Sequence, residues 1–212
     1  NGGVTGLTYT SPVNRTCKTL RINVFTCPSD IPNAPTVTGG IAMPNYNYAA
    51  NYGNTVYGQH TFQTVGFLGA PFGNIQADTA RPVLGCVGFA QINDGLSNTL
   101  LISEIIQGQG NDLRGRVSGY SDGGAFTAWN TPNTHLPDIM PAGTCNPAPG
   151  NPLNPPCSTQ NATSTTNNPR YLASRSRHPG GVNSLLGDGS VRFFMNSVAL
   201  QVWRSVATIR GG

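Results

Sequence analysis

The stretch Val182-Asn-Ser-Leu-Leu-Gly-Asp-Gly-Ser-Val-Arg-Phe-Phe-Met195 decides the fold. Two apolar runs flank Gly187-Asp-Gly-Ser190, and glycine accepts the positive φ that tight hairpin turns require. The stretch therefore predicts a β-hairpin. Directly after it, Asn196 and Ser197 supply capping side chains for a short helix over residues 198–207, with apolar residues spaced along its faces.

The composition of the rest of the chain favours further short strands over helices. Only 9% of the 212 residues are charged, and Lys18 and Glu104 are the only lysine and the only glutamate. The Lys–Glu pairs typical of solvated helices are thus missing. The chain instead carries 27 Gly and 17 Pro, which favour turns. Apolar patterns predict strands at 20–25, 100–106 and near 125–129.

These patterns together predict an α+β, mainly β fold. We expect a single globular domain over residues 1–212, built on an antiparallel sheet with long Pro/Gly/Asn-rich loops and a short C-terminal helix. Residues 131–169 are expected to form one long loop, because they hold nine of the 17 prolines.

The five cysteines form two close pairs and one remainder. Cys145 with Cys157 would staple the long loop as a disulfide, and Cys17 with Cys27 is the second candidate pair. Disulfides form in oxidising compartments, so both pairs point to an extracellular location. Cys86 lies in an apolar run and is expected to be a buried thiol. No cysteine belongs to a C-x-x-C pair, and the three histidines lie far from them in the sequence, so a structural zinc site is not predicted.

The net charge of +4 is dilute, although six arginines fall in the last fifth of the chain. A nucleic-acid-binding surface would add lysines and interleaved aromatic residues. Arginines that cap carbonyls or meet an acidic partner fit the pattern better, so we expect no nucleic-acid partner. No stretch approaches the roughly 20 apolar residues of a membrane span, and none reads as a signal peptide.

Glu104 lies inside the apolar run Leu100-Leu-Ile-Ser-Glu-Ile-Ile106. A buried carboxylate is costly without a partner, and an arginine is the first expectation, with backbone donors and a metal ion as alternatives. Oxygen-rich Asp-Gly turns suit a hard cation, so Asp94, Glu104 and Asp188 are candidate calcium ligands. The alternative is that Asp94 and Asp188 close turns through their own backbone. No other cofactor is expected.

Tyrosines gather in the stretch Pro44-Asn-Tyr-Asn-Tyr-Ala-Ala-Asn-Tyr-Gly53. Tyr46, Tyr48 and Tyr52, together with Trp129, are candidate residues for binding a glycan or another polymer. In a Gly/Asn-rich stretch, tyrosine rings more often pack internally and hydrogen-bond irregular backbone. Candidate glycosylation sequons begin at Asn14 and Asn161.

Five segments carry a resemblance to a known family. They are Phe25-Thr-Cys-Pro-Ser-Asp30; Asn45-Tyr-Asn-Tyr-Ala-Ala-Asn51; Ile92-Asn-Asp-Gly-Leu-Ser-Asn-Thr99 with Glu104; Ser176-Arg-His-Pro-Gly-Gly-Val-Asn183 with Asp188-Gly-Ser-Val-Arg-Phe193; and Trp203-Arg-Ser-Val-Ala-Thr-Ile-Arg-Gly-Gly212. Nine residues separate His178 from Asp188. In these features the chain resembles a pilin-like family of unknown function, expanded in planctomycetes, that ends in an H-x9-DG motif.

The resemblance implies a fold and a role. Members of that family resemble type IV prepilins and type II secretion pseudopilins, which carry a cleavable leader, a hydrophobic helix that anchors and polymerises, and a β-rich head. The sequence given starts at Asn1-Gly-Gly without such a helix, so membrane contact would depend on a helix absent from it. We expect a non-enzymatic structural or assembly module on the cell surface, with copies of itself or other pilin-like subunits as partners.

Two alternatives to this role are weighed. One is an extracellular carbohydrate- or polymer-binding module that uses the Asn/Tyr loop at residues 44–57. The other is an enzyme, because His178 has serines and Asp188 nearby in the sequence. The resemblance carries no known reaction and the chain has no nucleophile elbow, so no catalytic residues are expected.

Two spatial expectations follow from the hairpin and from the family. The hairpin should bring Asp188 back beside His178 as a structural pair, with Asn183 and Gly189 in the same motif. A pilin head leaves one face for a helix. We therefore expect either a subunit interface or an uncovered apolar strip on a sheet built from residues 20–25, 100–106 and 182–195.

Overall fold

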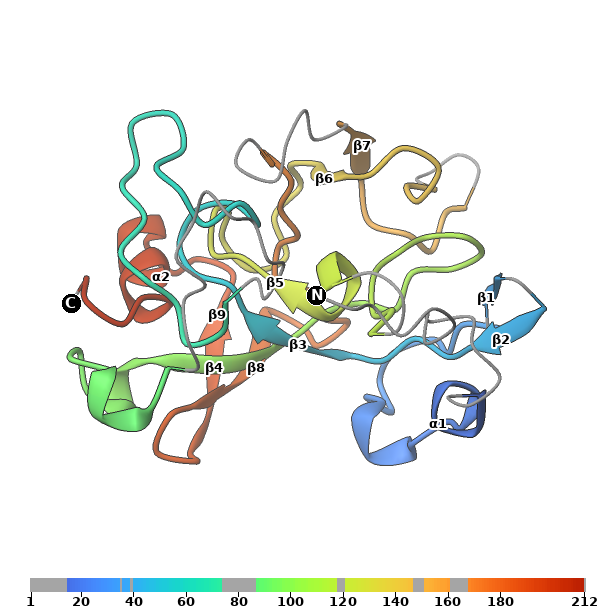
Figure 1. Ribbon diagram of the computed structural model, residues 1–212, viewed down its shortest axis with the longest axis horizontal. Helices are drawn as coiled ribbons and strands as arrows, with labels where there is room; N and C mark the ends of the chain where they lie inside the picture. The colour runs from blue at the N-terminus through green and yellow to red at the C-terminus, as the bar shows by residue number, and fades with distance from the viewer. Residues whose placement is uncertain are drawn as a thin grey trace, which may run out of the picture.

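A computed structural model of the chain describes residues 15–34, 36–38, 40–73, 87–117, 121–146, 151–160 and 168–211. Its fold is mixed α+β and mainly β, as predicted (Figure 1). The centre is a five-stranded sheet in the order β5-β3-β4-β8-β9. Its strands are β3 (Tyr48–Asn51), β4 (Leu100–Glu104), β5 (Ala125–Phe126), β8 (Gly181–Leu186) and β9 (Val191–Met195). All neighbours pair antiparallel except β3 with β5.

Two small sheets and short helices complete the described fold. β1 (Thr36–Thr38) pairs antiparallel with β2 (Ile41–Met43), and β6 (Asp138–Met140) pairs parallel with β7 (Cys157–Thr159). The α-helices are α1 (Arg15–Thr19) and α2 (Leu200–Val206), and the 3-10 turns are η2 (Asn23–Phe25), η3 (Phe89–Gln91), η4 (Leu96–Asn98) and η5 (Ser121–Gly124). Figure 1 places β6 and β7 above the large sheet, and α1 at the lower right beneath β1 and β2. No helix in the described part of the chain is long and apolar enough to cross a bilayer.

The predicted C-terminal hairpin is confirmed. β8 and β9 pair antiparallel from Gly181↔Met195 to Leu185↔Val191. Gly189 takes a φ of 85° in the turn between them, a conformation that side chains disfavour. The expected helix follows as α2, but its N-cap is Ala199, which makes no side-chain capping bond. The prediction that Asn196 and Ser197 cap this helix was therefore wrong.

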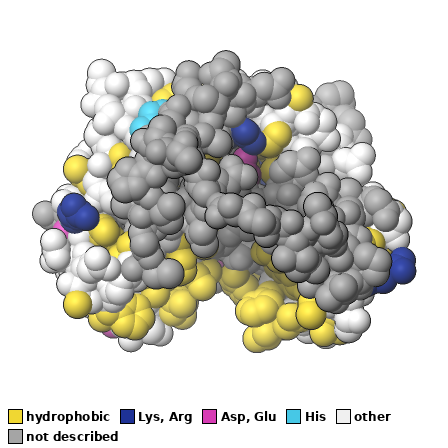
Figure 2. All heavy atoms as spheres, in the orientation of Figure 1, with side chains coloured by type: hydrophobic (Ala, Val, Ile, Leu, Met, Phe, Trp, Pro, Cys, Tyr) yellow, Lys and Arg dark blue, Asp and Glu magenta, His cyan; other side chains and the backbone are white. Residues whose placement is uncertain are grey.

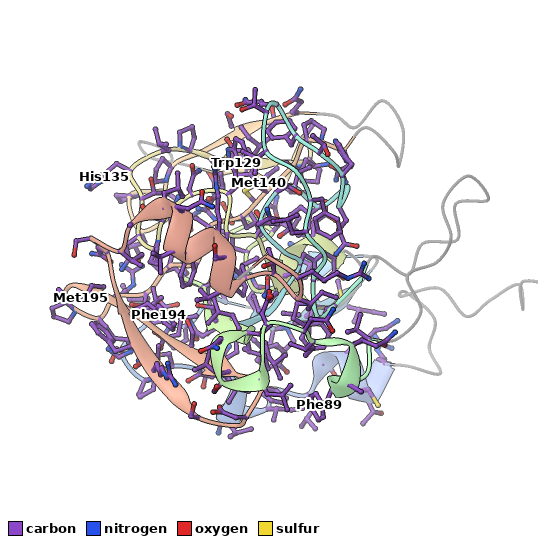
Figure 3. All side chains as sticks on the ribbon, turned by 90° about the vertical axis from the view of Figure 1, so that its left-hand side faces the viewer. Phe89, Trp129, His135, Met140, Phe194 and Met195 are labelled. Carbon is purple, nitrogen blue, oxygen red and sulfur yellow. A yellow bond between two sulfur atoms is a disulfide. The ribbon has the colours of Figure 1, made fainter. Side chains whose placement is uncertain are left out.

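One face of the large sheet is covered by α2. Trp203 is completely buried and shares a hydrophobic cluster with residues of β3, β4, β5 and β8. Phe194 packs its ring against Trp203, with centroids 5.3 Å apart. Figure 3 shows Phe194 nearer to α2 than Met195, which lies at the outer margin of the molecule. Successive residues of β9 thus face opposite sides of the sheet, as strand geometry requires.

The other face of the large sheet is open and mostly apolar. Its register places Tyr48 beside Glu104, Ile102 beside Leu185, and Leu185 beside Val191. We call the set Tyr48, Ile102, Leu185, Val191, Phe193 and Met195 the open sheet face. The side chains on β9 are the most exposed of these, at 65% for Val191, 49% for Phe193 and 61% for Met195. No described helix or strand packs over them, so the expected uncovered apolar strip is present on β4, β8 and β9.

Residues 20–25 do not form the predicted strand of this sheet. Residues 23–25 form the 3-10 turn η2, and Leu20, Val24 and Phe25 remain exposed. The apolar residues that alternate in this segment face solvent from a turn, so their spacing does not mark a strand. On the side away from β8, the strand that borders β4 is β3. It lies in the Tyr/Asn-rich stretch that was expected to be a loop.

The predicted long loop at 131–169 contains structure of its own. β6 and β7 lie within it, and Met140 belongs to a second hydrophobic cluster with Tyr57, Leu113 and Leu172. Asp138, also on β6, is fully buried and accepts hydrogen bonds from the guanidinium groups of Arg114 and Arg175 at 3.0–3.1 Å. A buried ion network of this kind anchors the segment to the body of the fold.

Candidate functional site

A groove of about 370 Å³ lies on the open sheet face and shares Tyr48, Ile102, Leu185 and Val191 with it. Its lining includes Cys27, Tyr48, Glu104, His178, Asn183 and Leu185. Figure 2 shows hydrophobic side chains in two groups along the lower edge of the molecule, with a hollow between them. The groups lie where Figure 1 places the β8–β9 hairpin on one side and α1 with η2 on the other.

Glu104, at the end of β4, is the acidic residue of this groove. Its side chain is only 3% exposed, so its carboxylate needs partners. The backbone N–H of Asn183 donates to Oε2 at 2.7 Å, and Nε2 of His178 lies 3.1 Å from Oε1. The expected arginine partner was therefore wrong. A backbone N–H of β8 and the imidazole of His178 are the partners of this carboxylate instead.

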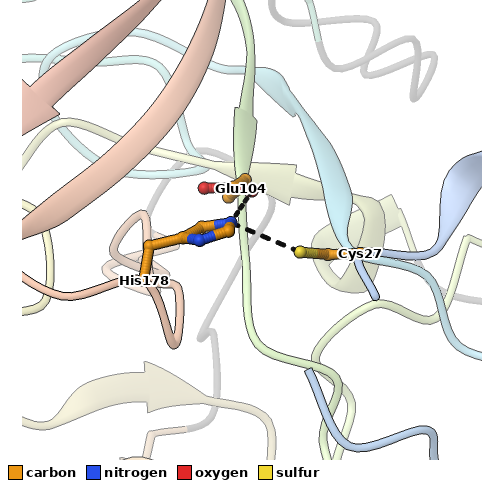
Figure 4. A group of neighbouring side chains, drawn as sticks. All are labelled: Cys27, Glu104 and His178. Atoms are coloured by element: carbon orange, nitrogen blue, oxygen red, sulfur yellow. Dashed lines mark hydrogen bonds and ion pairs between the residues drawn. The ribbon is translucent and has the colours of Figure 1, made fainter. Parts of the chain in front are cut away.

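His178 lies on the segment that leads into β8. Its backbone N–H donates to Oγ of Ser176 at 3.1 Å, which fixes the start of the Pro-Gly-Gly turn. The same Nε2 atom that faces Glu104 also lies 3.4 Å from Sγ of Cys27. Figure 4 shows the imidazole between the two side chains, with both contacts drawn from one nitrogen. Three residues from distant parts of the sequence thus converge on one point.

Cys27 is held by a buried network of polar side chains. Its backbone N–H donates to Oδ1 of Asn47 at 2.9 Å, and the amide of Asn47 donates in turn to Oδ2 of Asp30 at 2.6 Å. Arg177 donates to Oδ1 of Asp30 at 2.7 Å. Gln107 bonds both Asn47 and Asp30. This network positions the turn after Cys27 rigidly against the end of β4.

Tyr48 borders the same groove from β3. Burial raises the pKa of its phenol, and the nearby Cys27 and Glu104 raise it further. The group therefore stays a neutral hydroxyl at physiological pH. It contributes a half-buried aromatic ring, and no charge, to the lining of the groove.

The arrangement differs from a nucleophile–base–orienter triad. In such a triad one imidazole nitrogen faces the nucleophile and the other faces the carboxylate. Here Nε2 faces both Cys27 and Glu104. The geometry is that of three donor atoms gathered around a point, all within 4.8 Å of one another.

The candidate calcium ligands are not gathered. Asp94 accepts hydrogen bonds from the side chain of Thr208 and the backbone of Gly211. Asp188 is exposed and accepts both the backbone and side-chain bonds of Ser190 within the hairpin turn. Glu104 is the one member of the three at the groove. The alternative, in which the aspartates close turns, describes Asp188 correctly.

The expected pairing of His178 with Asp188 is also wrong. The turn that holds Asp188 and Gly189 lies at the far end of the β8–β9 hairpin from Gly181, to which the His178 segment leads. Asn183, the other residue named in this motif, does reach the site. It contributes its backbone N–H to Glu104, as described above.

Of the two predicted disulfides, one is confirmed and one is wrong. Cys145 and Cys157 are bonded, with an S–S distance of 2.07 Å. Cys17 is an exposed free thiol on α1, and Cys27 is a buried free thiol directed at His178. Cys86 and the sequon residues Asn14 and Asn161 lie outside the described residues.

The candidate aromatic binding residues pack mainly against the protein itself. Tyr46 is buried and its hydroxyl donates to the carbonyl of Leu20 at 2.9 Å. Tyr52 packs edge-on against Tyr57. Trp129 contacts Phe62 and lies under the guanidinium of Arg204, which is 4.2 Å from its ring centre. Tyr48 alone reaches the groove.

Sequence reasoning identified Glu104 and His178 but did not place Cys27 with them. The spacing of Cys17 and Cys27 favoured a disulfide, and no local pattern links Cys27 to residues 77 and 151 positions away. A signal was nevertheless present. Four of the five segments that carry the family resemblance each place a residue at the groove: Cys27, Tyr48, Glu104, and His178 with Asn183.

Comparison with known proteins gives a family and no further relative. A family model described as "Protein of unknown function (DUF1559)" matches residues 6–201. No curated protein and no solved structure matches the chain. The matched range covers most of the chain and includes the hairpin and every residue of the groove. The chain therefore belongs to the DUF1559 family of proteins of unknown function.

Proposed function

We propose that the protein is a non-enzymatic extracellular assembly module, comparable to a pilin or pseudopilin head, which binds another copy of itself through its open sheet face. The observation that carries the proposal is the exposure of Val191, Phe193 and Met195 in a row on one strand. Aromatic residues and methionine are enriched in protein interfaces. A contiguous apolar surface of this kind marks an interaction site.

A second copy is the partner that this face fits. β9 is the last strand of the sheet, and its outer edge pairs with no strand of the described residues. Exposed edges are usually blunted by lysine, proline or a bulge. β9 holds none of these, and Arg192 is its only charged residue. In a twofold dimer each copy presents the same patch to the other, so an open apolar face can serve both copies at once.

The composition and the disulfide support the proposed setting. With only 9% of its residues charged, the chain has few of the mixed surface charges that keep freely diffusing proteins apart. The Cys145–Cys157 disulfide fits an oxidising compartment outside the cytoplasm. The groove also lacks the arrangement of a catalytic triad, since Nε2 of His178 faces both Cys27 and Glu104, whereas a triad uses one ring nitrogen for each partner.

Sedimentation equilibrium of the purified chain over a range of concentrations tests the proposal. We expect concentration-dependent association that the variant Phe193→Glu weakens by at least about tenfold, because a carboxylate would be buried in an apolar contact at a cost above about 1.4 kcal/mol. Leu136→Glu is the matched control, since Leu136 is 58% exposed but precedes β6, away from the open sheet face. A wild-type chain that stays monomeric throughout, or equal effects of the two variants, would overturn the proposal.

A further inference from the structure

We propose that Cys27, Glu104 and His178 bind one Zn²⁺ ion. The donor atoms are Sγ, a carboxylate oxygen and Nε2, which all lie within 4.8 Å of one another. They come from three segments: the turn after η2, the end of β4, and the approach to β8. This site is independent of the proposed assembly role and reverses the expectation, drawn from cysteine spacing, that the chain holds no zinc site.

Both donor separations that involve Nε2 of His178 are close to the edges of a zinc coordination tetrahedron. Bonds of about 2.3 Å to sulfur and about 2.0–2.2 Å to nitrogen and oxygen place S and N about 3.6 Å apart and N and O about 3.4 Å apart. The observed separations are 3.4 Å for Sγ to Nε2 and 3.1 Å for Nε2 to Oε1. The third pair, Sγ and the carboxylate oxygen, lies within 4.8 Å.

Hydrogen bonding alone does not account for this convergence. An imidazole nitrogen carries either one proton or one lone pair in its plane, so it makes one good hydrogen bond. Nε2 of His178 nevertheless faces a thiol and a carboxylate at once. A cation between the three atoms satisfies all of them, because each offers one lone pair to it.

The surroundings hold the three ligands in place before any ion binds. Oε2 of Glu104 accepts the backbone N–H of Asn183 at 2.7 Å, which leaves Oε1 directed at the site. The backbone of Cys27 is tied to Asn47, and that of His178 to Ser176. Partners of this kind orient ligands and contribute to metal affinity.

The donor set selects zinc over calcium. Calcium binds six to eight oxygen atoms, whereas a thiolate, an imidazole and a carboxylate in tetrahedral array suit zinc. Binding releases the thiol proton of Cys27 to solvent, since the thiolate is the ligand. The groove along Tyr48 and Leu185 leaves the fourth position open to water or to a group from a bound molecule.

Cobalt substitution and zinc titration test the site. The protein used for these measurements carries the two substitutions Cys17→Ser and Cys86→Ala. Cys27 is then its single thiol outside the Cys145–Cys157 disulfide. Co²⁺ should then bind with one ion per chain and give thiolate-to-cobalt charge-transfer absorption. Zn²⁺, measured by competition with a chromogenic chelator, should displace Co²⁺ and raise the melting temperature, whereas Ca²⁺ should do neither.

Three variants separate a metal site from a hydrogen-bonded cluster. Cys27→Ser and Glu104→Gln keep the approximate size and shape of the ligands, and each should weaken zinc binding by more than about 100-fold, since loss of an outer partner alone costs about 10–100-fold. His135→Ala, at an exposed histidine, should leave binding unchanged. Absence of zinc binding to the wild type, or binding that persists unchanged in Cys27→Ser and Glu104→Gln, would overturn the proposal.

Discussion

Sγ of Cys27 lies 3.4 Å from Nε2 of His178, although 151 residues separate them in the chain. Glu104, on the strand between them, faces the same nitrogen. This contact joins the N-terminal turn, the central sheet and the approach to the C-terminal hairpin at one end of the open sheet face. It places three potential metal ligands beside the apolar residues of the open sheet face.

The cysteine arrangement gives a first prediction. A non-reducing peptide map should show Cys145 linked to Cys157 and no peptide that links Cys17 to Cys27. Alkylation of the native protein should modify Cys17 faster than Cys27, because Cys17 is exposed and Cys27 is 8% exposed. A linked Cys17–Cys27 peptide would show that the thiol of Cys27 does not face His178.

The buried ion network gives a second prediction. Asp138→Asn removes the charge that faces both Arg114 and Arg175, and should lower the free energy of unfolding by about 3–5 kcal/mol, because buried Arg175 loses the carboxylate it pairs with, while Arg114 keeps Asp112. Urea unfolding would measure the loss. Asp188→Asn, at an exposed turn, should stay within about 0.5 kcal/mol of the wild type. Equal stability of the two variants would show that the network does not anchor β6.

Two glycines with the same backbone conformation give a third prediction. Gly115 and Gly189 both have a φ of 85°. A Cβ at Gly189 meets open space, so Gly189→Ala should cost about 1–2 kcal/mol for the left-handed conformation alone. A Cβ at Gly115 would lie 2.3 Å from the carbonyl oxygen of Tyr46. Gly115→Ala should therefore cost a further ~1–3 kcal/mol by overpacking, which thermal or urea unfolding would detect. A smaller loss for Gly115→Ala than for Gly189→Ala would contradict this packing.

The elements that could be predicted from the sequence are those whose own residues carry a clear pattern, such as an apolar run or a turn motif. The Asp-Gly turn between two apolar runs predicted β8 and β9, and the run at 100–106 predicted β4. β3 was missed because its sequence, Tyr-Ala-Ala-Asn, has little strand character, and its pairing depends on β4 lying beside it. Residues 20–25 show the opposite case: their apolar alternation suggested a strand, but they form a turn with exposed side chains.

The candidate site was only half predictable for a related reason. Glu104 stood out because a lone carboxylate in an apolar run needs a partner. Which partner it meets depends on strand order, which places β8 beside β4 and brings Asn183 and His178 to its carboxylate. Pairing Cys27 with Cys17 by proximity in the sequence failed because α1 leaves Cys17 exposed, while the turn after η2 directs Cys27 toward the sheet.

The claim that the open sheet face binds a second copy is tested most directly by cysteine cross-linking. Phe193 is the middle member of the exposed row on β9, so a twofold axis that passes through this row would bring it next to its own copy. In a Cys17→Ser, Cys86→Ala background, Phe193→Cys should form a covalent dimer under mild oxidation. Leu136→Cys, similarly exposed but distant from this face, should stay mostly monomeric. Equal dimer yields from the two variants, or none from Phe193→Cys, would contradict the account.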